Sequence, residues 1–316
     1  MAAKSSVENS RLPPSNDNWM AKLPQKLQNI PLNQLSIPGS HDSFSFGLDR
    51  SSEIGPDTAQ TIRDLVKVFG AMAKDVIYRW SMTQSLTFTQ QLNAGIRYFD
   101  LRISTRQTSS DIFFLHCLFA HKVEPCLQDI NTFLEQHPKE IAILDFNHMY
   151  GFNESTHQQM LTMIQGVFGS KLCPVQDMEN LTLSQLWKDH LQVIAIYHQD
   201  DLPRECNNIW PKTSVRSPWP NTTDVDQMIK FQEQVFAESH TCKDIFLVHQ
   251  GVLTPDATYI MSRFTGSLRT DLVAKAVPAF IKWLQMKKAD SKNLNICVID
   301  YVEKEGFIGQ VIEFNK

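Results

Sequence analysis

IPGSHDSFSF, residues 37–46, places a His-Asp pair directly after a Pro-Gly turn at the end of a short apolar run. Imidazole titrates near neutral pH, and a neighbouring carboxylate determines which ring nitrogen carries the proton. A histidine in this setting is a proton carrier on a loop that follows a strand. His41 and Asp42 are therefore the first candidates for a catalytic site.

On either side of this pair, strands alternate with helices along the chain after Trp19, which is typical of a parallel sheet with crossover helices. The expected strands are residues 34–37, 96–103, 112–117, 140–146, 191–197, 213–217, 245–249 and 295–300. Eight such strands predict one α/β domain built as a (β/α)₈ barrel of the TIM type, regular or irregular.

Helix signals fall between these strands. Thr87 with Gln90 and Thr182 with Gln185 match capping boxes, as does Ser155 with Gln158. The segment 48–85 is longer than an ordinary connection and contains a helical stretch over 61–73. We expect it to be an insertion at the rim of the barrel after the first strand, serving as a lid or as an element that faces a membrane.

Composition limits the class of protein. The 316 residues are 42% hydrophobic and 20% charged, with a net charge of −4, which indicates a globular protein and argues against a nucleic-acid partner. No stretch approaches the ~18 apolar residues of a membrane span, and the N-terminus lacks the apolar region of a signal peptide. We expect a cytoplasmic protein with reduced cysteines, a disordered polar tail at 1–17 and the barrel at 18–316.

Chemistry-bearing side chains gather where the expected strands end, which is where the active site of such a barrel lies. They are His41 and Asp42, Asp100 and Arg102, His116, Asn147 and His148, Tyr197 and His198, His249, and Asp300. Asp100 and Arg102 are two residues apart on a strand, so both point to one face, and a charged pair inside a barrel needs a function or compensation.

Four segments in this order resemble the X domain of phosphatidylinositol-specific phospholipase C: IPGSHDSFSF, GIRYFDLR, the FLH strand and AILDFNH. The resemblance is to the short, stand-alone X-domain proteins of animals and extends from about residue 18 to residue 314. It implies a bare catalytic barrel that cleaves phosphoinositide into diacylglycerol and inositol phosphate or inositol cyclic phosphate, a reaction of lipid metabolism and signal transduction.

That reaction needs one base and one acid. The resemblance assigns the base to His41 and the acid to His116, with Asp42 and Asp300 as the carboxylates that orient them. The pattern of the bacterial enzymes pairs Asp300 with His41 and Asp42 with His116. Substrate contacts are then expected from the remaining polar groups: Asp100, Asn147, His148, Tyr197 and Arg216.

Calcium-dependent members of this family carry carboxylates at positions where this chain has Arg102 and Asn147. A guanidinium repels calcium but grips a phosphate with two hydrogen bonds. We therefore expect no cofactor, calcium-independent catalysis by His41, His116, Asp42, Arg102 and Asp300, and a phosphoinositide lipid substrate reached by peripheral contact with a membrane, without a transmembrane segment.

Three other interpretations stay open. A transition-metal site could use His41, Asp42, Asp100, His116 and His148, although Arg102 argues against it. Cys117, His121 and Cys126 resemble a zinc site only in number, because their spacing matches no standard pattern. The third is a binding module that holds phosphoinositide or inositol phosphate without turnover.

Overall fold

The computed structural model describes residues 12–200 and 207–316. Within them, ten strands form one sheet. Their bounds are β1 Ile37–Ser40, β2 Tyr98–Arg106, β3 Ser109–His116, β4 Leu118–Lys122, β5 Ala142–Tyr150, β6 Val193–Tyr197, β7 Ile209–Pro211, β8 Val215–Arg216, β9 Phe246–Gln250 and β10 Ile296–Ile299.

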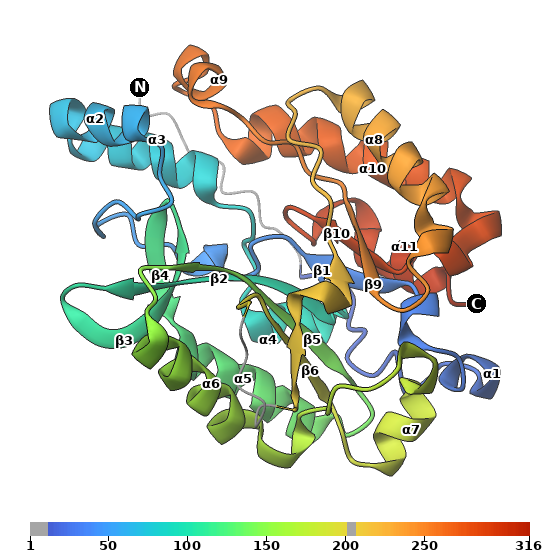
Figure 1. Ribbon diagram of the computed structural model, residues 1–316. Helices are drawn as coiled ribbons and strands as arrows, with labels where there is room; N and C mark the ends of the chain where they lie inside the picture. Colours follow the sequence, from blue (N-terminus) through green and yellow to red (C-terminus); the bar gives the residue numbers. More distant parts are fainter. Residues whose placement is uncertain (1–11, 201–206) are drawn as a thin grey trace.

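Eight of these strands are parallel and follow the order β7-β6-β5-β2-β1-β10-β9-β8. The order starts and ends with β7 and β8, which follow one another in the chain through the 3₁₀ turn Lys212–Ser214 and are not paired in the described sheet. The fold is therefore a TIM-type α/β barrel that is open at one seam. Figure 1 shows the strands at the centre with helices around them.

Two expected strands take other roles. The segment 112–117 lies in β3, which pairs antiparallel with β2 and with β4, so it is a side hairpin and not the third barrel strand. The eighth parallel strand is β7, which the sequence analysis missed, and the segment 213–217 contributes only the two residues of β8. Strands this short carry little periodic signal.

The first strand also differs from the expectation. β1 is IPGS itself, whereas residues 32–34 form a 3₁₀ turn, so Pro38 and Gly39 lie inside the strand and not in a turn after it. Gly39 is required there because an added Cβ would lie 2.8 Å from the Tyr98 ring. His41 and Asp42 directly follow β1, at the C-terminal end of a barrel strand, as predicted.

Helices cover the barrel, and α5, α6, α8, α10 and α11 bury apolar residues against the core. They are α1 Gln25–Gln28, α2 Gln60–Phe69, α3 Ala71–Ser81, α4 Phe88–Ala94, α5 Val123–Gln136, α6 Glu154–Phe168, α7 Leu183–Lys188, α8 Val225–Ala237, α9 Ala257–Ser262, α10 Ala274–Met286 and α11 Phe307–Glu313. The capping box of Thr87 and Gln90 starts α4 as predicted. Asn153 caps α6 with Thr156 as its partner, two residues before the predicted Ser155, and Asn is among the best N-cap residues.

The insertion 48–85 contains α2 and α3, which meet at Gly70, where φ is 52°. Its helical part is therefore longer than the predicted 61–73 and is broken once. In Figure 1, α2, α3 and α9 gather at the same end of the molecule. This end carries the C-terminal ends of the barrel strands.

The predicted polar tail is described only from residue 12. Within this tail, Asn16 is held by two hydrogen bonds. Its amide N–H donates to the Asn93 carbonyl at 2.8 Å, and its side chain donates to the Ala94 carbonyl at 3.0 Å. The packed part of the chain thus begins at Asn16 rather than at residue 18. Residues 1–11 lie outside the described part.

Candidate active site

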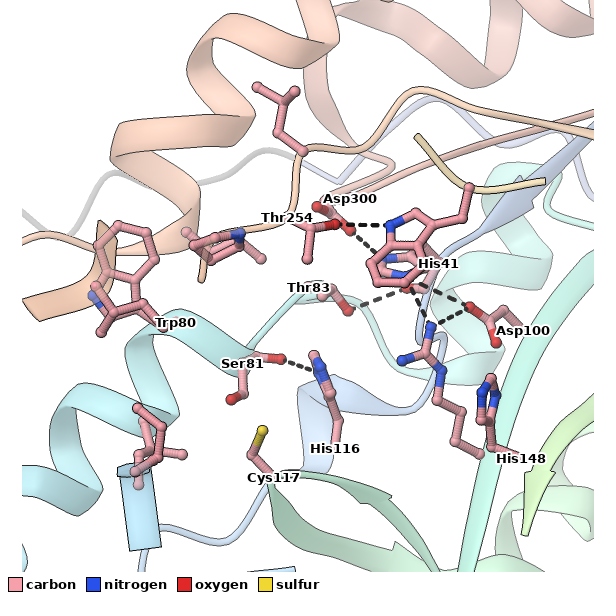
Figure 2. A pocket seen from close by; sticks show the side chains of 18 of the residues that line it. His41, Trp80, Ser81, Thr83, Asp100, His116, Cys117, His148, Thr254 and Asp300 are labelled. Carbon is pink, nitrogen blue, oxygen red and sulfur yellow. Dashed lines mark hydrogen bonds and ion pairs between the residues drawn. The ribbon is translucent and has the colours of Figure 1, made fainter. Parts of the chain in front are cut away.

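A cavity of about 960 Å³ opens at the C-terminal ends of the barrel strands (Figure 2). His41 reaches it from the end of β1, Asp100 and Arg102 from β2, His116 from β3, and Asp300 from the end of β10. Asp100 and Arg102 thus share the inner face of β2, as their spacing predicts. Asn147 and His148 of β5 also line this cavity.

His41 is held by Asp300. The Nδ1 atom of His41 lies 2.7 Å from Oδ1 of Asp300, so Nδ1–H donates to the carboxylate and leaves Nε2 as the atom that can take a proton. Nε2 lies 3.0 Å from Nη2 of Arg102. This is the pairing of His41 with Asp300 that the resemblance implies.

His116 is held at the end of α3. Its Nδ1 atom lies 2.8 Å from the carbonyl oxygen of Ser81, to which Nδ1–H donates, and 3.3 Å from Oδ2 of Asp42. The other ring nitrogen, Nε2, is therefore the one available for chemistry. The fixed tautomers make the two rings alike, since each is anchored through Nδ1.

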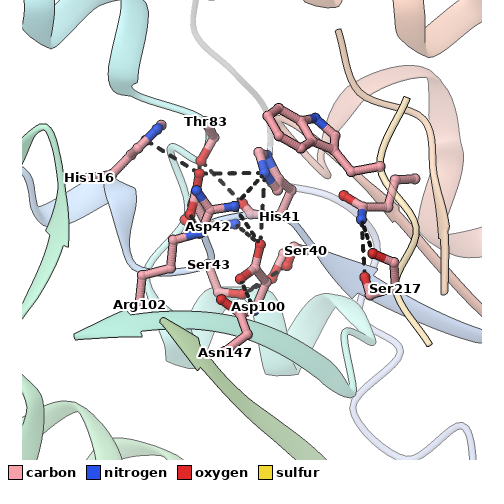
Figure 3. A network of polar contacts seen from close by, with 12 residues as sticks. Ser40, His41, Asp42, Ser43, Thr83, Asp100, Arg102, His116, Asn147 and Ser217 are labelled. Atoms are coloured by element: carbon pink, nitrogen blue, oxygen red, sulfur yellow. Dashed lines mark hydrogen bonds and ion pairs between the residues drawn. The ribbon is translucent and has the colours of Figure 1, made fainter. Parts of the chain in front are cut away.

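Arg102 links the two histidines through shared carboxylates (Figure 3). Its Nε lies 2.7 Å from Oδ1 of Asp42 and its Nη2 lies 3.4 Å from Oδ2 of Asp100. Asp42 is fully buried, and its Oδ2 is 3.5 Å from Nε2 of His41 and 3.3 Å from Nδ1 of His116. The other oxygen of Asp100 accepts a hydrogen bond from Asn147 Nδ2 at 2.6 Å.

Burial and charge set the protonation of this network. Burial alone would lower the pKa of His41, but the Asp42 and Asp300 carboxylates outweigh it and raise the pKa to about 9. Burial would raise the pKa of Asp100, yet Arg102 and His41 hold it well below its usual range. Burial raises the pKa of Asp300, although His41 opposes that shift.

The backbone is strained beside three of the key groups. Asp42, Cys117 and Tyr301 follow His41, His116 and Asp300, and their φ angles are 41°, 59° and 52°. Non-glycine residues in this left-handed region cost about 1–3 kcal/mol each and concentrate at functional sites. The turn after each strand aims the preceding side chain into the cavity.

A connection after α3 supports His41 and was not identified from the sequence. Gln84 Nε2 donates to the carbonyl of His41 at 3.0 Å, and Thr83 Oγ1 donates to the same carbonyl at 3.1 Å. Ser81 holds His116 from the same segment. The only signal was the polar run after Trp80, which resembles an ordinary loop.

Two predicted substrate contacts lie elsewhere. Tyr197 is fully buried and its hydroxyl lies 3.0 Å from Nδ1 of His157 on α6, outside the barrel. Arg216 forms an ion pair with Glu238 after α8. We correct both assignments, because neither side chain lines the cavity.

A buried carboxylate on β5 was missed. Asp145 Oδ1 lies 2.8 Å from Nε2 of His198, and Oδ2 accepts a hydrogen bond from the Tyr98 hydroxyl at 2.5 Å. Asp145 and His198 both line the cavity beside Asn147 and His148. An aspartate inside the apolar run AILDF was the available signal.

Among the described residues, one group has the spacing of a metal site: His41, Asp42 and Asp100. Arg102 already contacts both of these carboxylates, so its guanidinium supplies the positive charge that a metal ion would otherwise provide. The donor set does not suit calcium. Cys117, His121 and Cys126 form no such group in the described part, and the His121 ring packs on Phe46 instead.

Known proteins resemble this chain over nearly its whole length. Residues 76–194 match the family described as "Phosphatidylinositol-specific phospholipase C, X domain". PI-PLC X domain-containing protein 3 of Mus musculus is 40% identical over 300 residues, which cover 94% of this chain and 93% of that protein. The chain belongs to the family of PI-PLC X domain-containing proteins.

A second relative of the X-domain family, PI-PLC X domain-containing protein 2 of Mus musculus, is 42% identical over 302 residues, covering 95% of this chain and 88% of that protein. The fold is similar to that of the phosphatidylinositol-specific phospholipase C from Listeria monocytogenes, with a TM-score of 0.67, 19% identity and coverage of 96% and 99% of the two chains. The barrel is therefore the fold of the bacterial enzymes.

Proposed function

We propose that this X-domain protein is a phosphoric diester hydrolase of the phosphatidylinositol phospholipase C type. The observation that carries this proposal is the arrangement of two histidines, each anchored through Nδ1, around one Arg102–Asp42 ion pair. A base, an acid and a fixed cation are what the cleavage of this phosphodiester requires.

In the proposed reaction, the inositol 2-hydroxyl attacks phosphorus and gives its proton to Nε2 of His41. The phosphorus–oxygen bond to glycerol breaks, and His116 in its imidazolium form gives its Nε2 proton to the leaving oxygen, which yields diacylglycerol and an inositol cyclic phosphate. Attack by water with the two roles exchanged would open the cyclic phosphate. Arg102 balances the negative charge that develops on the phosphoryl oxygens.

We also propose that no calcium is needed, because Arg102 takes its electrostatic role. Activity of the purified protein should persist in a chelator. Loss of activity on chelation, with recovery only on addition of calcium, would refute this part.

Peripheral contact of the protein with a membrane surface is supported by an apolar rim around the cavity mouth. This apolar rim consists of Val68, Phe69, Met72, Met261 and Phe264, which are 45–74% exposed. Exposed apolar side chains gathered at one end indicate an interaction site. No helix in residues 12–200 or 207–316 has the length and apolarity to cross a membrane. We propose action on the membrane from the cytoplasm.

The cavity favours an inositol ring without additional phosphates. Among the described residues that line it, Arg102 is the sole lysine or arginine, whereas Asp100, Asp145 and Asp300 are carboxylates. A ring phosphate would meet these carboxylates without a second fixed cation. We therefore propose phosphatidylinositol as the preferred phosphoinositide.

The test is release of water-soluble inositol phosphate from vesicles of phosphatidylinositol in phosphatidylcholine. Wild type should release it, and His41→Ala and His116→Ala should not. His157→Ala is the matched control, because His157 lies on α6 outside the barrel. Equal release by wild type and His41→Ala would refute the assigned base.

The second candidate function is a binding module without turnover. One observation favours it: the raised pKa of His41, about 9, leaves most of the imidazole protonated at neutral pH in the absence of a ligand. Binding of wild type to phosphatidylinositol vesicles with no release of product at pH 7 or pH 9 would support the module.

A further inference from the structure

One wall of the catalytic cavity is apolar and runs from the mouth to His116. Ala73, Val76, Ile77 and Trp80 of α3 recur with helical spacing, line the cavity and are each 4–8% exposed. The next residue, Ser81, accepts the hydrogen bond from His116. From Met72 at the rim to Ser81, this helical face covers roughly 13 Å.

A second apolar face lies beside α3. Leu253, Ile260 and Leu268 line the same cavity from the segment that includes α9. The two faces are tied together at one edge: the Trp80 and Tyr259 rings contact edge to face at 5.8 Å, and Arg79 donates to the carbonyls of Phe264 and Gly266. We call Val76, Ile77, Trp80, Leu253, Ile260 and Leu268 the apolar wall.

The polar groups lie on the other side of the catalytic centre. Asp100 lines the cavity from β2, Asp145, Asn147 and His148 line it from β5, and His198 lines it from the end of β6. Figure 2 shows Trp80 and Ser81 on the side of His116, whereas Asp100 and His148 lie beyond His41. A bound phosphodiester at Arg102 would thus have a polar compartment toward one substituent and an apolar compartment toward the other.

The size of the cavity also exceeds what a head group needs. Its volume of about 960 Å³ is at the upper end of the roughly 300–1,000 Å³ that encloses a drug-sized ligand. Apolar surface that lines a water-filled cavity is unfavourable, so an apolar wall beside a reaction centre fits an apolar ligand.

We propose that the apolar wall binds the glycerol backbone and the first acyl carbons of the lipid substrate, and so places the leaving oxygen at His116. This rests on the proposed function, because the occupant is the diacylglycerol part of its substrate. The wall differs from the apolar rim in burial: the rim side chains are 45–74% exposed, whereas Val76, Ile77, Trp80, Leu253 and Leu268 of the wall are 3–7% exposed.

The experiment uses monomeric phosphatidylinositols below their critical micelle concentration, so that no membrane surface contributes. The series runs from sn-glycero-3-phosphoinositol, which has no acyl chain, through dibutanoyl to dioctanoyl chains. For wild type, kcat/KM should rise by about fourfold for each methylene that enters the wall and then reach a plateau. This first measurement needs no variant.

Two variants distinguish the role of the apolar wall from that of the apolar rim. Ile77→Ser should reduce the ratio of kcat/KM for the dioctanoyl substrate to that for glycerophosphoinositol by about tenfold or more. Val68→Ser, in the rim at a residue that is 74% exposed and does not line the cavity, should keep this ratio while it weakens binding to vesicles. A wild-type kcat/KM that does not depend on acyl length, or an Ile77→Ser variant with the wild-type ratio, would overturn the proposal.

Failure of the proposed function has a different signature. If that function is wrong, wild type releases no inositol phosphate from any member of the series or from vesicles. If only the role assigned to the apolar wall is wrong, wild type releases inositol phosphate at a rate that does not depend on acyl length.

Discussion

Two arginines, one just before β2 and one in the middle of it, show how the same kind of ion pair can serve the fold or the chemistry. Arg97, just before β2, is fully buried and donates to Glu140 at 2.7 and 3.0 Å and to the carbonyls of Leu92, Ile96 and Asp17. Arg102, within β2, is 22% exposed and contacts two carboxylates and a histidine at the cavity.

The partners explain the difference. Arg97 and Glu140 connect β2 to the N-terminal segment, because Glu140 also accepts hydrogen bonds from the amides of Met20 and Ala21. Burial lowers the pKa of Arg97 although Glu140 opposes it, and burial raises the pKa of Glu140. In the middle of β2, Arg102 is surrounded by groups that move protons or carry negative charge. We infer that the first pair sets stability and the second sets reactivity.

The largest expected effect is on stability, in Arg97→Met. This substitution leaves the Glu140 carboxylate buried without its partner, and we expect a loss of about 3–5 kcal/mol in the free energy of unfolding. Urea denaturation at pH 7 measures it. The double variant Arg97→Met/Glu140→Leu should recover much of the loss, since it removes both charges. A loss below about 1 kcal/mol in the single variant would contradict the structural role.

Next in size is the effect of Arg102→Lys on activity. An ammonium group keeps the charge but cannot contact Asp42 and a phosphate with two parallel hydrogen bonds, so kcat should fall by about 10²–10³-fold. The free energy of unfolding should change much less than in Arg97→Met. Arg106→Lys is the control, because Arg106 lies on the same strand and pairs with the partly exposed Glu53. A similar fall in kcat in both lysine variants would remove the special role of Arg102.

The pH dependence gives a smaller but direct test of the catalytic end. His41 must lose its proton to act as a base, so kcat/KM, which reports the free enzyme, should rise with pH through about 9. In Asp300→Asn the negative charge beside Nδ1 is gone, the pKa of His41 falls, and this rise should move to lower pH.

Asp145→Asn serves as the matched variant, since Asp145 lies in the same cavity but contacts His198 and Tyr98. Its pH profile should rise where that of wild type does. A shift of equal size in both asparagine variants would mean that the profile reports the charge of the whole cavity and not the His41–Asp300 pair.

The surroundings of Arg102 and of Arg97 were not equally predictable from the sequence. The site around Arg102 could be predicted because the strand ends of a parallel barrel meet at one rim, so counting strands brings His41, Asp100 and Arg102 together. The assignment of Tyr197 failed on alternation: its neighbour His198 faces the cavity, and successive residues point to opposite sides. Arg97 gave no signal, because nothing local indicates that Glu140, 43 residues away, lies beside it.

The residue pattern did not indicate backbone strain either. Strain is a second difference between the catalytic site around Arg102 and the structural site around Arg97. The positions that follow His41, His116 and Asp300 are non-glycine residues with positive φ, whereas near Arg97 the positive φ of 118° falls on a glycine, Gly95. Glycine at position 117 would adopt the φ of 59° without a steric cost. Burial raises the pKa of the Cys117 thiol to about 12, so the side chain is no nucleophile at neutral pH.

The smallest expected effect therefore comes from Cys117→Gly. Relief of the left-handed conformation stabilises the fold by about 1–2 kcal/mol, while the greater freedom of glycine in the unfolded chain costs about 0.5–1 kcal/mol. The net change should be a gain of less than about 1.5 kcal/mol with kcat retained. His190→Gly has the same geometry, with φ of 58°, at an exposed position away from the cavity. If both glycine variants gain similar stability but only Cys117→Gly loses activity, the Cys117 side chain, and not the turn alone, positions His116.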